Sequence, residues 1–454
     1  MMRPGAGRSR FLGRADLLVR RAQQVVTLRG WSERPVAGSP EPGWLGLVED
    51  GAVACRGDRI VAVGRTGEVE RQVSWDRETV VVDAQGHALL PGLVDPHTHA
   101  VYAGDRAEEW GRLLRGEPYL RILQSGGGIW QTVRRTREAS TEDLVSGMAE
   151  RLRRMMRAGA TTIEVKSGYA LEPEGELRLL DAIAAAAELV PVQVVPTFLG
   201  AHAVPPEYRS DPEAYVDLVE QVMLPAAARR PGLARFCDVF CEEGAFTPDH
   251  ARRILSRAAR LGLGLKVHAD QFHPLGGARL AAEMGATSAD HLDFTPREDL
   301  ERLAASGTVA VLLPGAHLFT RSRALPDVEG MRYHRVPVAL ASDHNPGTSP
   351  VESMALVAAL GCTVLGLTPE ESVAGCTINA AHALALGHEV GSLEVGKRAD
   401  FILVAGPSYL HLPYRMGADG AVWMVVAAGR IVSGGGEREK TPLEEGETPD
   451  DADA

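Results

Sequence analysis

Residues that could bind a metal ion follow several apolar segments of this sequence. The strongest candidate is DPHTH (residues 95–99), which directly follows the apolar run LLPGLV. Residues two apart in an extended segment face the same side, so His97 and His99 can both reach one ion. An HxH pair is common by chance, and its place at the end of an apolar run is what gives it weight.

Three further candidates lie at the ends of later apolar runs: His268, His291 and Asp343. Imidazoles with one carboxylate suit zinc or ferrous iron, and three or four protein ligands leave a position for water. An ion held in this way activates water for hydrolysis near neutral pH. Any one of these residues could be a satisfied buried polar group. Their common placement instead favours a single metal ion held by His97, His99, His268 and Asp343.

The middle of the chain alternates apolar runs with helical patterns, and this alternation predicts eight parallel strands closed into a (β/α)₈ barrel. A helix rich in Ala and Leu is predicted over residues 172–189. Active sites of this fold lie at the carboxyl ends of the strands, where the candidate ligands are found. The eight runs, with the residues that follow them, are 89–99, 160–169, 192–202, 236–246, 264–272, 286–293, 308–315 and 336–344.

Both ends of the chain carry β-type runs separated by glycine-rich turns, and these are expected to pair into one small β-sandwich. The predicted organisation begins with a disordered leader (1–14) and the first part of the sandwich (15–88). The barrel (89–385), the second part of the sandwich (386–436) and a disordered acidic tail (437–454) follow.

Composition excludes several classes of protein. The net charge of −12 over 454 residues argues against nucleic acid or an anionic membrane as the main partner. The sequence has neither a secretory signal nor a run of about 18 apolar residues, so a cytoplasmic location is expected. Few, scattered cysteines indicate a reducing compartment without a disulfide framework: Cys55, Cys237, Cys241, Cys362 and Cys376.

The barrel, the flanking sandwich and the order of ligands resemble the amidohydrolase superfamily. Within it, the sequence is similar to the imidazolonepropionase family from about residue 15 to 435. That resemblance implies hydrolysis of the cyclic amide of 4-imidazolone-5-propanoate, a small anion, to N-formimino-L-glutamate in histidine degradation. The segments that carry it are PGLVDPHTHAVYAGDR, GATTIEVKSGY, TFLGAH, VHADQF, ADHLD and LASDHNPGTSP.

The resemblance also implies roles for individual residues. Arg106 is expected to pair with the substrate propionate, which suits the fork of its guanidinium group. Tyr169 and His202 are expected to hydrogen-bond the substrate. Asp343 and His291 are expected to carry the acid–base chemistry. The loop after Asp343 would contact substrate or product through Asn345, Gly347 and Thr348.

Two features depart from patterns common among amidohydrolases. Many members have HADE where this chain has HADQ, and Gln271 can orient the substrate but cannot accept a proton. The fourth run ends in Cys-Glu-Glu without the lysine that bridges two metals in some members, so one metal is expected. Lys166, at the end of the second run, is interpreted as structural or as supporting the ligands from behind, and not as a bridge between metals.

Several other residues are discounted as ligands. His344 follows Asp343 directly and is expected to face the opposite side. His273, His317 and His334 have no motif in their favour. The glycines at 126–128 lack the lysine and spacing of a phosphate-binding loop, and are interpreted as a mobile loop at the mouth of the barrel.

Two alternatives stay open at this point. One is another amidohydrolase, such as an aminohydrolase acting on a purine-like ring, because it would share the metal ligands. The other is a catalytically inactive barrel that serves as a binding protein, which is disfavoured because all four ligands are present. The choice between zinc and iron is open as well. So is the oligomeric state, for which a homodimer is the candidate.

Overall fold

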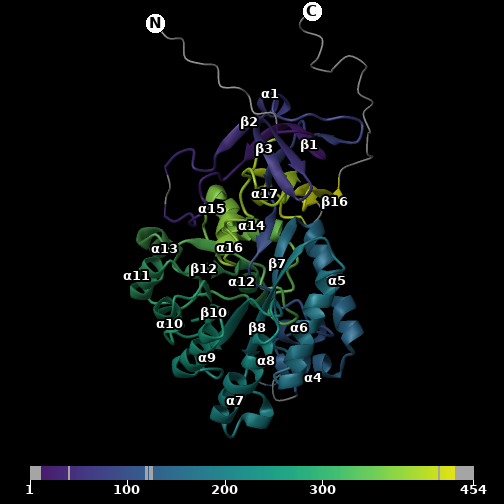
Figure 1. The fold of residues 1–454 in the computed structure, drawn as a ribbon. Helices are drawn as coiled ribbons and strands as arrows, with labels where there is room; N and C mark the ends of the chain where they lie inside the picture. The colour runs from purple at the N-terminus through teal and green to yellow at the C-terminus, as the bar shows by residue number, and fades with distance from the viewer. Residues whose placement is uncertain (1–11, 39–40, 118–120, 122–125, 418–419, 435–454) are drawn as a thin grey trace, which may run out of the picture.

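Two eight-stranded sheets organise the computed structural model (Figure 1). The structure describes residues 12–38, 41–117, 121, 126–417 and 420–434. Residues 1–11 of the expected leader and the whole expected acidic tail lie outside the described residues, so those two predictions are untested.

The larger sheet is a barrel of parallel strands in sequential order, each hydrogen-bonded to the next. The run at residues 89–99 divides between the two sheets, because its first residues pair with the small sheet and only Leu93–Asp95 enters the barrel. The barrel strands are β6 (Leu93–Asp95), β7 (Ala160–Lys166), β8 (Gln193–Ala201), β9 (Phe236–Cys241), β10 (Gly264–Ala269), β11 (Ser288–His291), β12 (Val309–Leu312) and β13 (Val338–Leu340).

Backbone hydrogen bonds beyond β6 and β13 join the first and last strands at the carboxyl end of the barrel. His99 N donates to His344 O at 2.8 Å, and Asp343 N donates to His97 O at 3.1 Å. A parallel bridge pairs Thr98 with His344 between them. The two histidines of the HxH motif and Asp343 are therefore fixed in register with one another by main-chain bonds.

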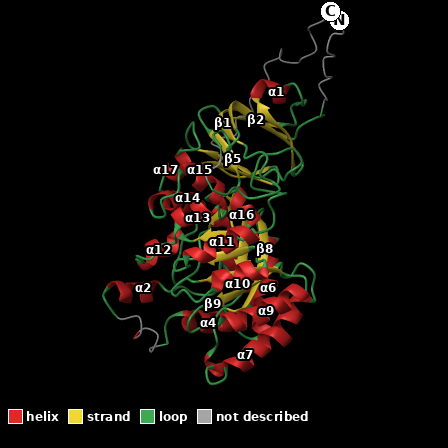
Figure 2. Ribbon diagram, turned by 90° about the vertical axis from the view of Figure 1, so that its left-hand side faces the viewer, coloured by secondary structure: helices red, strands yellow, loops and turns green. Residues whose placement is uncertain are grey.

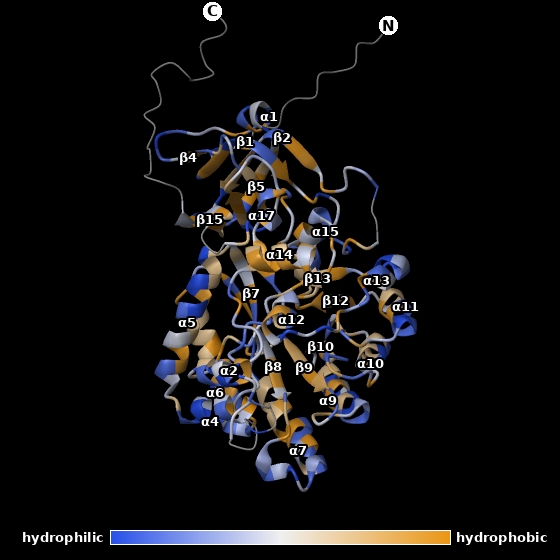
Figure 3. Ribbon diagram, turned by 180° about the vertical axis from the view of Figure 1, so that it is seen from behind, coloured by the Kyte–Doolittle hydropathy of each residue, from blue (hydrophilic) through white to orange (hydrophobic). Residues whose placement is uncertain are grey.

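Helices surround the barrel (Figure 2), and most of those on its outer side carry both hydrophilic and hydrophobic residues (Figure 3). The predicted Ala-rich helix is present as α6 (Pro173–Ala187). Helix α9 (Pro248–Arg260) begins with a capping box from Thr247 and His250. Others around the barrel are α5 (Thr141–Arg157), α7 (Pro212–Leu218), π-helical η2 (Val219–Met223), α8 (Leu224–Ala228), α10 (Gly277–Met284), α11 (Arg297–Ser306), α12 (Pro314–Thr320), α13 (Val328–His334), α14 (Met354–Thr363), α15 (Pro369–Gly375) and α16 (Ile378–His382).

Helices α2 (Ala107–Leu114) and α4 (Ile129–Glu138) lie in the described part of the long connection from β6 to α5. Figure 2 shows α2 at the edge of the barrel, beside α12. A stacked pair of rings, Trp110 on Phe319, joins these two helices, with 5.3 Å between centroids. A short 3₁₀ helix, η1 (Pro206–Tyr208), follows β8.

The smaller sheet is built from both ends of the chain, in the order β16-β15-β14-β5-β1-β2-β3 with β4 beside β1. Together with the barrel, it confirms the predicted fold class. Its strands are β1 (Leu17–Val26), β2 (Leu47–Arg56), β3 (Arg59–Arg65), β4 (Val80–Asp83), β5 (Ala88–Pro91), β14 (Phe401–Val404), β15 (Val422–Ala427) and β16 (Arg430–Gly434). Helices α1 (Thr66–Glu70) and α17 (His411–Tyr414) accompany it.

One hydrophobic core runs through the barrel and into the small sheet, with Val26 and Leu90 contributing from the sheet. All five cysteines are free, and four of them are buried, as expected for a chain without a disulfide framework. Among the described residues, no helix combines the length and apolarity needed to cross a membrane.

Candidate active site

Three imidazoles and one carboxylate converge at the carboxyl end of the barrel. His99 Nε2 lies 3.4 Å from His268 Nε2, and Asp343 Oδ1 lies 3.6 Å from Nε2 of both His97 and His99. All four side chains are almost completely buried. Residues from the first, fifth and eighth strand ends therefore present nitrogen and oxygen atoms to one point.

The orientation of the His97 ring leaves its inner nitrogen available. Its Nδ1 donates a hydrogen bond to Asp290 Oδ2 at 2.5 Å, which fixes the proton on that atom because a carboxylate only accepts. The opposite atom, Nε2, is buried and has no hydrogen-bond partner among the described residues. A buried nitrogen lone pair without a partner is costly, and a metal ion at the convergence point would satisfy it.

A second carboxylate, that of Asp238, lies behind the His268 ring. Nδ1 of His268 lies 3.0 Å from Asp238 Oδ2, and the His268 backbone N donates to Asp238 Oδ1 at 3.2 Å. Outer carboxylates of this kind direct the other ring nitrogen toward a metal and raise its basicity. The donor set and its orientation thus fit a divalent ion that binds nitrogen and oxygen.

Burial keeps the rings in the form that binds metals. It lowers the pKa of His97, His99 and His291 well below the usual value, so all three are uncharged at neutral pH. Burial also raises the pKa of Asp343 well above its usual range. These shifts favour a neutral site until a cation enters it.

His291 and Asp343 both have left-handed backbone geometry, with φ of 80° and 53°. His291 ends β11, and its ring centroid lies 5.6 Å from that of His97. Possible ligand atoms of His291, His97 and Asp343 lie within 4.8 Å of one another. Unusual backbone conformations held in place by surrounding structure are frequent at functional sites, and here they aim both side chains at the same point.

A buried charge network lies beneath the imidazoles. Lys166 Nζ lies 2.7 Å from Asp238 and 2.8 Å from Glu164, and 3.8 Å from Asp290. Lys266 lies near the same network and donates to Pro96 O at 2.9 Å. Burial by itself lowers the pKa of Lys166, but the three carboxylates outweigh burial and raise it. Lys166 is therefore a charged structural residue, as the sequence indicated, and not a neutral amine.

Replacing Asp290 by asparagine is expected to weaken metal affinity about 10–100-fold, because the His97 ring loses the carboxylate that orients it. Competition with a chelator for zinc or cobalt measures this affinity directly. Asp299→Asn is the matched control, because Asp299 is equally buried but pairs with Arg279 on the outside of the barrel. Equal affinities of the two variants would contradict an orienting role for Asp290.

Arg106 lies immediately before α2 and next to the loop that follows Asp343. A Cβ atom added to Gly347 would lie 1.9 Å from Arg106 Nη1, so only glycine allows the guanidinium group to approach this closely. Arg106 Nε also donates to Glu109 Oε1 at 3.0 Å. The structure thus brings together two residues expected to contact substrate, Arg106 and Gly347.

Asn345 shapes the loop in which Gly347 and Thr348 lie. Its Oδ1 accepts from the backbone N of both residues at 2.8 Å, and its Nδ2 donates to Asp343 O at 2.6 Å. The Asn345 side chain is therefore occupied by its own loop, which it holds against Asp343.

Tyr169 and His202 line the side of the site next to His99. The His202 ring stacks on His99 at 5.0 Å, and the Tyr169 ring lies 5.9 Å from His99. His202 Nδ1 donates to Gly168 O at 3.0 Å, and burial lowers the pKa of His202 to about 4. A neutral His202 with its proton on Nδ1 presents Nε2 as an acceptor.

Two neighbouring residues of the HADQ segment, Asp270 and Gln271, have different roles. Asp270 accepts hydrogen bonds from the backbone N of Gly276, Gly277 and Ala278, and thereby caps α10. Gln271, the next residue, is half-buried, and its side chain makes no hydrogen bond with another described residue. Its amide group is therefore free to contact a ligand.

The discounted histidines are engaged elsewhere, with one exception. His344 points away from the centre toward Tyr102 and Val351 O, as predicted. His273 pairs with Glu242 on the surface, and His334 ends α13. His317 is the exception, since it is buried with its Nε2 3.2 Å from Asp293 and is close enough to influence His291.

Four residues around the site were not predicted from the sequence: Asp238, Asp290 and Asp293 were not singled out, and His317 was discounted. Two of them left a signal in the sequence. Asp290 directly precedes His291, and Asp293 follows it by two residues within the segment ADHLD. Asp238 lies within a buried strand and His317 within a helix, and neither position indicated a partner.

Comparison with known proteins shows the family of this chain. A sequence model of the Amidohydrolase family matches residues 88–432. Imidazolonepropionase from Symbiobacterium thermophilum is 49% identical over 92% of this chain and 97% of that protein. Imidazolonepropionase from Geobacillus kaustophilus is 47% identical over 93% of this chain and 99% of that protein. This chain belongs to the imidazolonepropionase family of amidohydrolases.

Solved structures similar to this amidohydrolase show the same fold. An adenosine deaminase from Xanthomonas campestris with bound zinc has a TM-score of 0.67 at 21% identity, covering 93% of this chain and 94% of that chain. Guanine deaminase from E. coli has a TM-score of 0.67 at 16% identity, covering 91% and 98%. At these identities the likeness concerns the fold, and the barrel with its flanking sheet is common to all three.

Proposed function

We propose that this amidohydrolase opens the ring of 4-imidazolone-5-propanoate to give N-formimino-L-glutamate in histidine degradation. The observation that carries this proposal is the 49% identity to an imidazolonepropionase over nearly the full length of both chains. The alternative, an aminohydrolase acting on a purine-like ring, has support only from structural neighbours at 16–21% identity.

We infer that one divalent ion, zinc or iron, is held by His97, His99, His268 and Asp343. The inference is supported by the unpartnered Nε2 of His97 and by the carboxylates behind His97 and His268. When bound, such an ion polarises the substrate carbonyl and lowers the pKa of water. The protein residues described next supply proton transfer and orientation.

Asp343 is the proposed general base and acid. It takes a proton from the attacking water and returns it to the ring nitrogen that leaves. Its carboxylate lies 3.6 Å from Nε2 of both His97 and His99, beside the place proposed for the ion and its water. Gln271 cannot share this task because an amide does not take up a proton at neutral pH.

His291 is proposed to stabilise the tetrahedral oxyanion. Burial lowers its pKa, so the ring is neutral and one nitrogen carries a hydrogen for donation. Removal of a single donor of this kind typically costs about 3–4 kcal/mol of transition-state stabilisation. Tyr169, His202 and Gln271 are proposed to hold the substrate in position, together with Asn345, Gly347 and Thr348.

Arg106 is proposed to bind the substrate propionate. Arg106→Ala is expected to raise KM about 10–100-fold with a smaller change in kcat, since a charged hydrogen bond contributes about 1.5–3 kcal/mol. Steady-state kinetics with the imidazolone measure both constants. Arg115→Ala, at the other end of α2, is the control. An unchanged KM in Arg106→Ala would show that the anion binds elsewhere.

The function is tested by measuring how fast the metal-loaded protein hydrolyses each of three compounds: imidazolonepropanoate, guanine and hydantoin. The first substrate is expected to be hydrolysed, with loss of activity on chelation and recovery on addition of zinc or iron. Metal analysis before and after chelation gives the number of ions per chain. Ammonia release from guanine, without ring opening of the imidazolone, would favour the aminohydrolase instead.

The cellular location and the assembly of the protein are proposed from the sequence. A cytoplasmic location and a homodimer remain predictions. The absence of nucleic-acid or membrane partners is also a prediction, and the net charge of −12 supports it. Size-exclusion chromatography with light scattering tests the assembly.

A further inference from the structure

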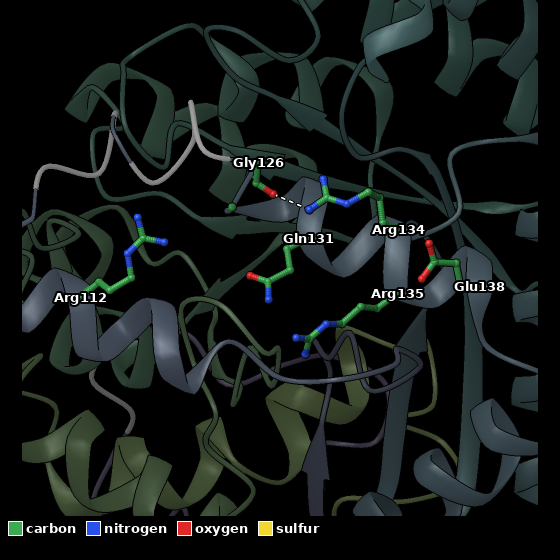
Figure 4. Close-up of a pocket in the computed structure, with 7 residues that line it drawn as sticks. Arg112, Gly126, Gln131, Arg134, Arg135 and Glu138 are labelled. Carbon is green, nitrogen blue, oxygen red and sulfur yellow. Dashed lines mark hydrogen bonds between the residues drawn. The ribbon is translucent and has the colours of Figure 1, made fainter.

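A cavity of about 380 Å³ lies between α2 and α4, apart from the convergence point of the histidines. Figure 4 shows Arg112 on α2 facing Gln131 and Arg135 on α4 across this space. Arg134 and the backbone at Gly126 complete one wall. The volume is sufficient for a small organic or inorganic ligand.

Two of these arginines lack an acidic partner. Arg134 Nη2 donates to Gly126 O at 2.6 Å, and Arg135 Nη1 donates to Asp105 O at 3.1 Å. Neither forms an ion pair with a carboxylate in the part of the chain that the structure describes. Each guanidinium group has five N–H donors, so each retains donors for a ligand.

The remaining charges at the cavity leave it positive. Arg112 is held by Glu117 through hydrogen bonds of 2.8 and 2.6 Å, so it adds little net charge. Glu138 also lines the cavity and offsets part of the charge of Arg134 and Arg135. The cavity is positive although the whole chain has a net charge of −12. Its local positive potential attracts small anions.

We propose that this cavity binds a small dianion, bearing either phosphate or two carboxylates, through Arg134, Arg135 and Gln131. Two adjacent guanidinium forks match the paired oxygens of phosphate or carboxylate, and the Gln131 amide adds a neutral donor. This site goes beyond the proposed function, because the substrate propionate is proposed to bind at Arg106, beside Gly347, and not in this cavity.

The cavity wall is connected to that substrate arginine. Gly128, two residues after Gly126, donates its backbone N to Glu109 Oε2 at 2.7 Å. The other oxygen of Glu109 accepts from Arg106 Nε at 3.0 Å. A ligand that holds the backbone at Gly126–Gly128 in place therefore also acts on the Glu109 carboxylate, which positions Arg106. Ligand binding in the cavity can change substrate affinity through this connection.

Binding of inorganic phosphate and of glutarate to the metal-loaded protein tests the proposal by titration calorimetry at constant ionic strength. Saturable binding of at least one of them is expected in the wild type, and at least tenfold weaker binding in the double variant Arg134→Ala/Arg135→Ala. The control Arg229→Ala/Arg260→Ala removes two exposed arginines outside the cavity and is expected to bind as the wild type does.

Arg106→Ala separates this site from the substrate site, and it is expected to retain dianion binding. Phosphate binding alone would identify a phosphate site, and glutarate binding alone a dicarboxylate site. Three outcomes would overturn the proposal: no saturable binding in the wild type, undiminished binding in the double variant, or loss of binding in Arg106→Ala.

Discussion

Asp343→Asn is expected to lower kcat about 10³-fold or more while the protein remains folded. The amide has nearly the same shape as the carboxylate, but it cannot accept the proton from water and is a weaker metal ligand. A general base alone contributes about 10²–10⁴-fold. The Asp343 carboxylate lies 3.6 Å from Nε2 of both His97 and His99. Its replacement therefore removes the proton acceptor and weakens metal binding at the same time.

The measurement combines kcat on the imidazolone, metal content and the circular dichroism spectrum of the variant. Asp181→Asn is the control, because Asp181 is a partly exposed carboxylate paired with Arg230 away from the site. A variant Asp343→Asn that kept kcat within about tenfold of the wild type would show that another group transfers the proton.

Lys166→Met is expected to destabilise the protein by about 3–5 kcal/mol, the usual cost of removing one partner of a buried ion pair. Asp238 and Glu164 are completely buried and lie within 2.8 Å of the lysine ammonium group. Without Lys166, Glu164 would keep Lys266 as a cation at 3.4 Å, and Asp238 would have no lysine or arginine paired with it among the described residues. The midpoint of unfolding in urea measures the loss.

The pH dependence of this loss distinguishes unpaired charge from lost packing. Burial alone would raise the pKa of Asp238, but His268 and Lys166 together hold it well below its usual value. Wild-type stability from this carboxylate is therefore present above the unfolded pKa of about 4 and is lost as the pH falls. In Lys166→Met the carboxylates would have raised pKa values, and protonation would stabilise the fold.

The difference in stability between wild type and Lys166→Met is thus expected to shrink as the pH falls from 7 toward 4. Arg260→Met, which removes an exposed cation, is expected to change stability by less than about 0.5 kcal/mol at either pH. A difference that stayed constant with pH would indicate that Lys166 contributes packing rather than charge.

Much of the fold could be predicted from local patterns. The alternation of apolar runs and helices determines a parallel barrel because each unit repeats the same local structure. The Ala-rich stretch predicted as a helix over 172–189 is helical over Pro173–Ala187. The ligand candidates followed from the same logic, since residues after strands of one barrel must lie at one end of it.

The sequence by itself thus determined the barrel, the small sheet from both chain ends and the end of the barrel where His97, His99, His268 and Asp343 meet. Only the tertiary structure decided what supports them. Asp290 and Asp238 lie behind two of the rings, and the guanidinium of Arg106 lies against Gly347. Such contacts join residues far apart in the chain, and strand or helix periodicity specifies which face a side chain occupies but not which distant side chain it meets.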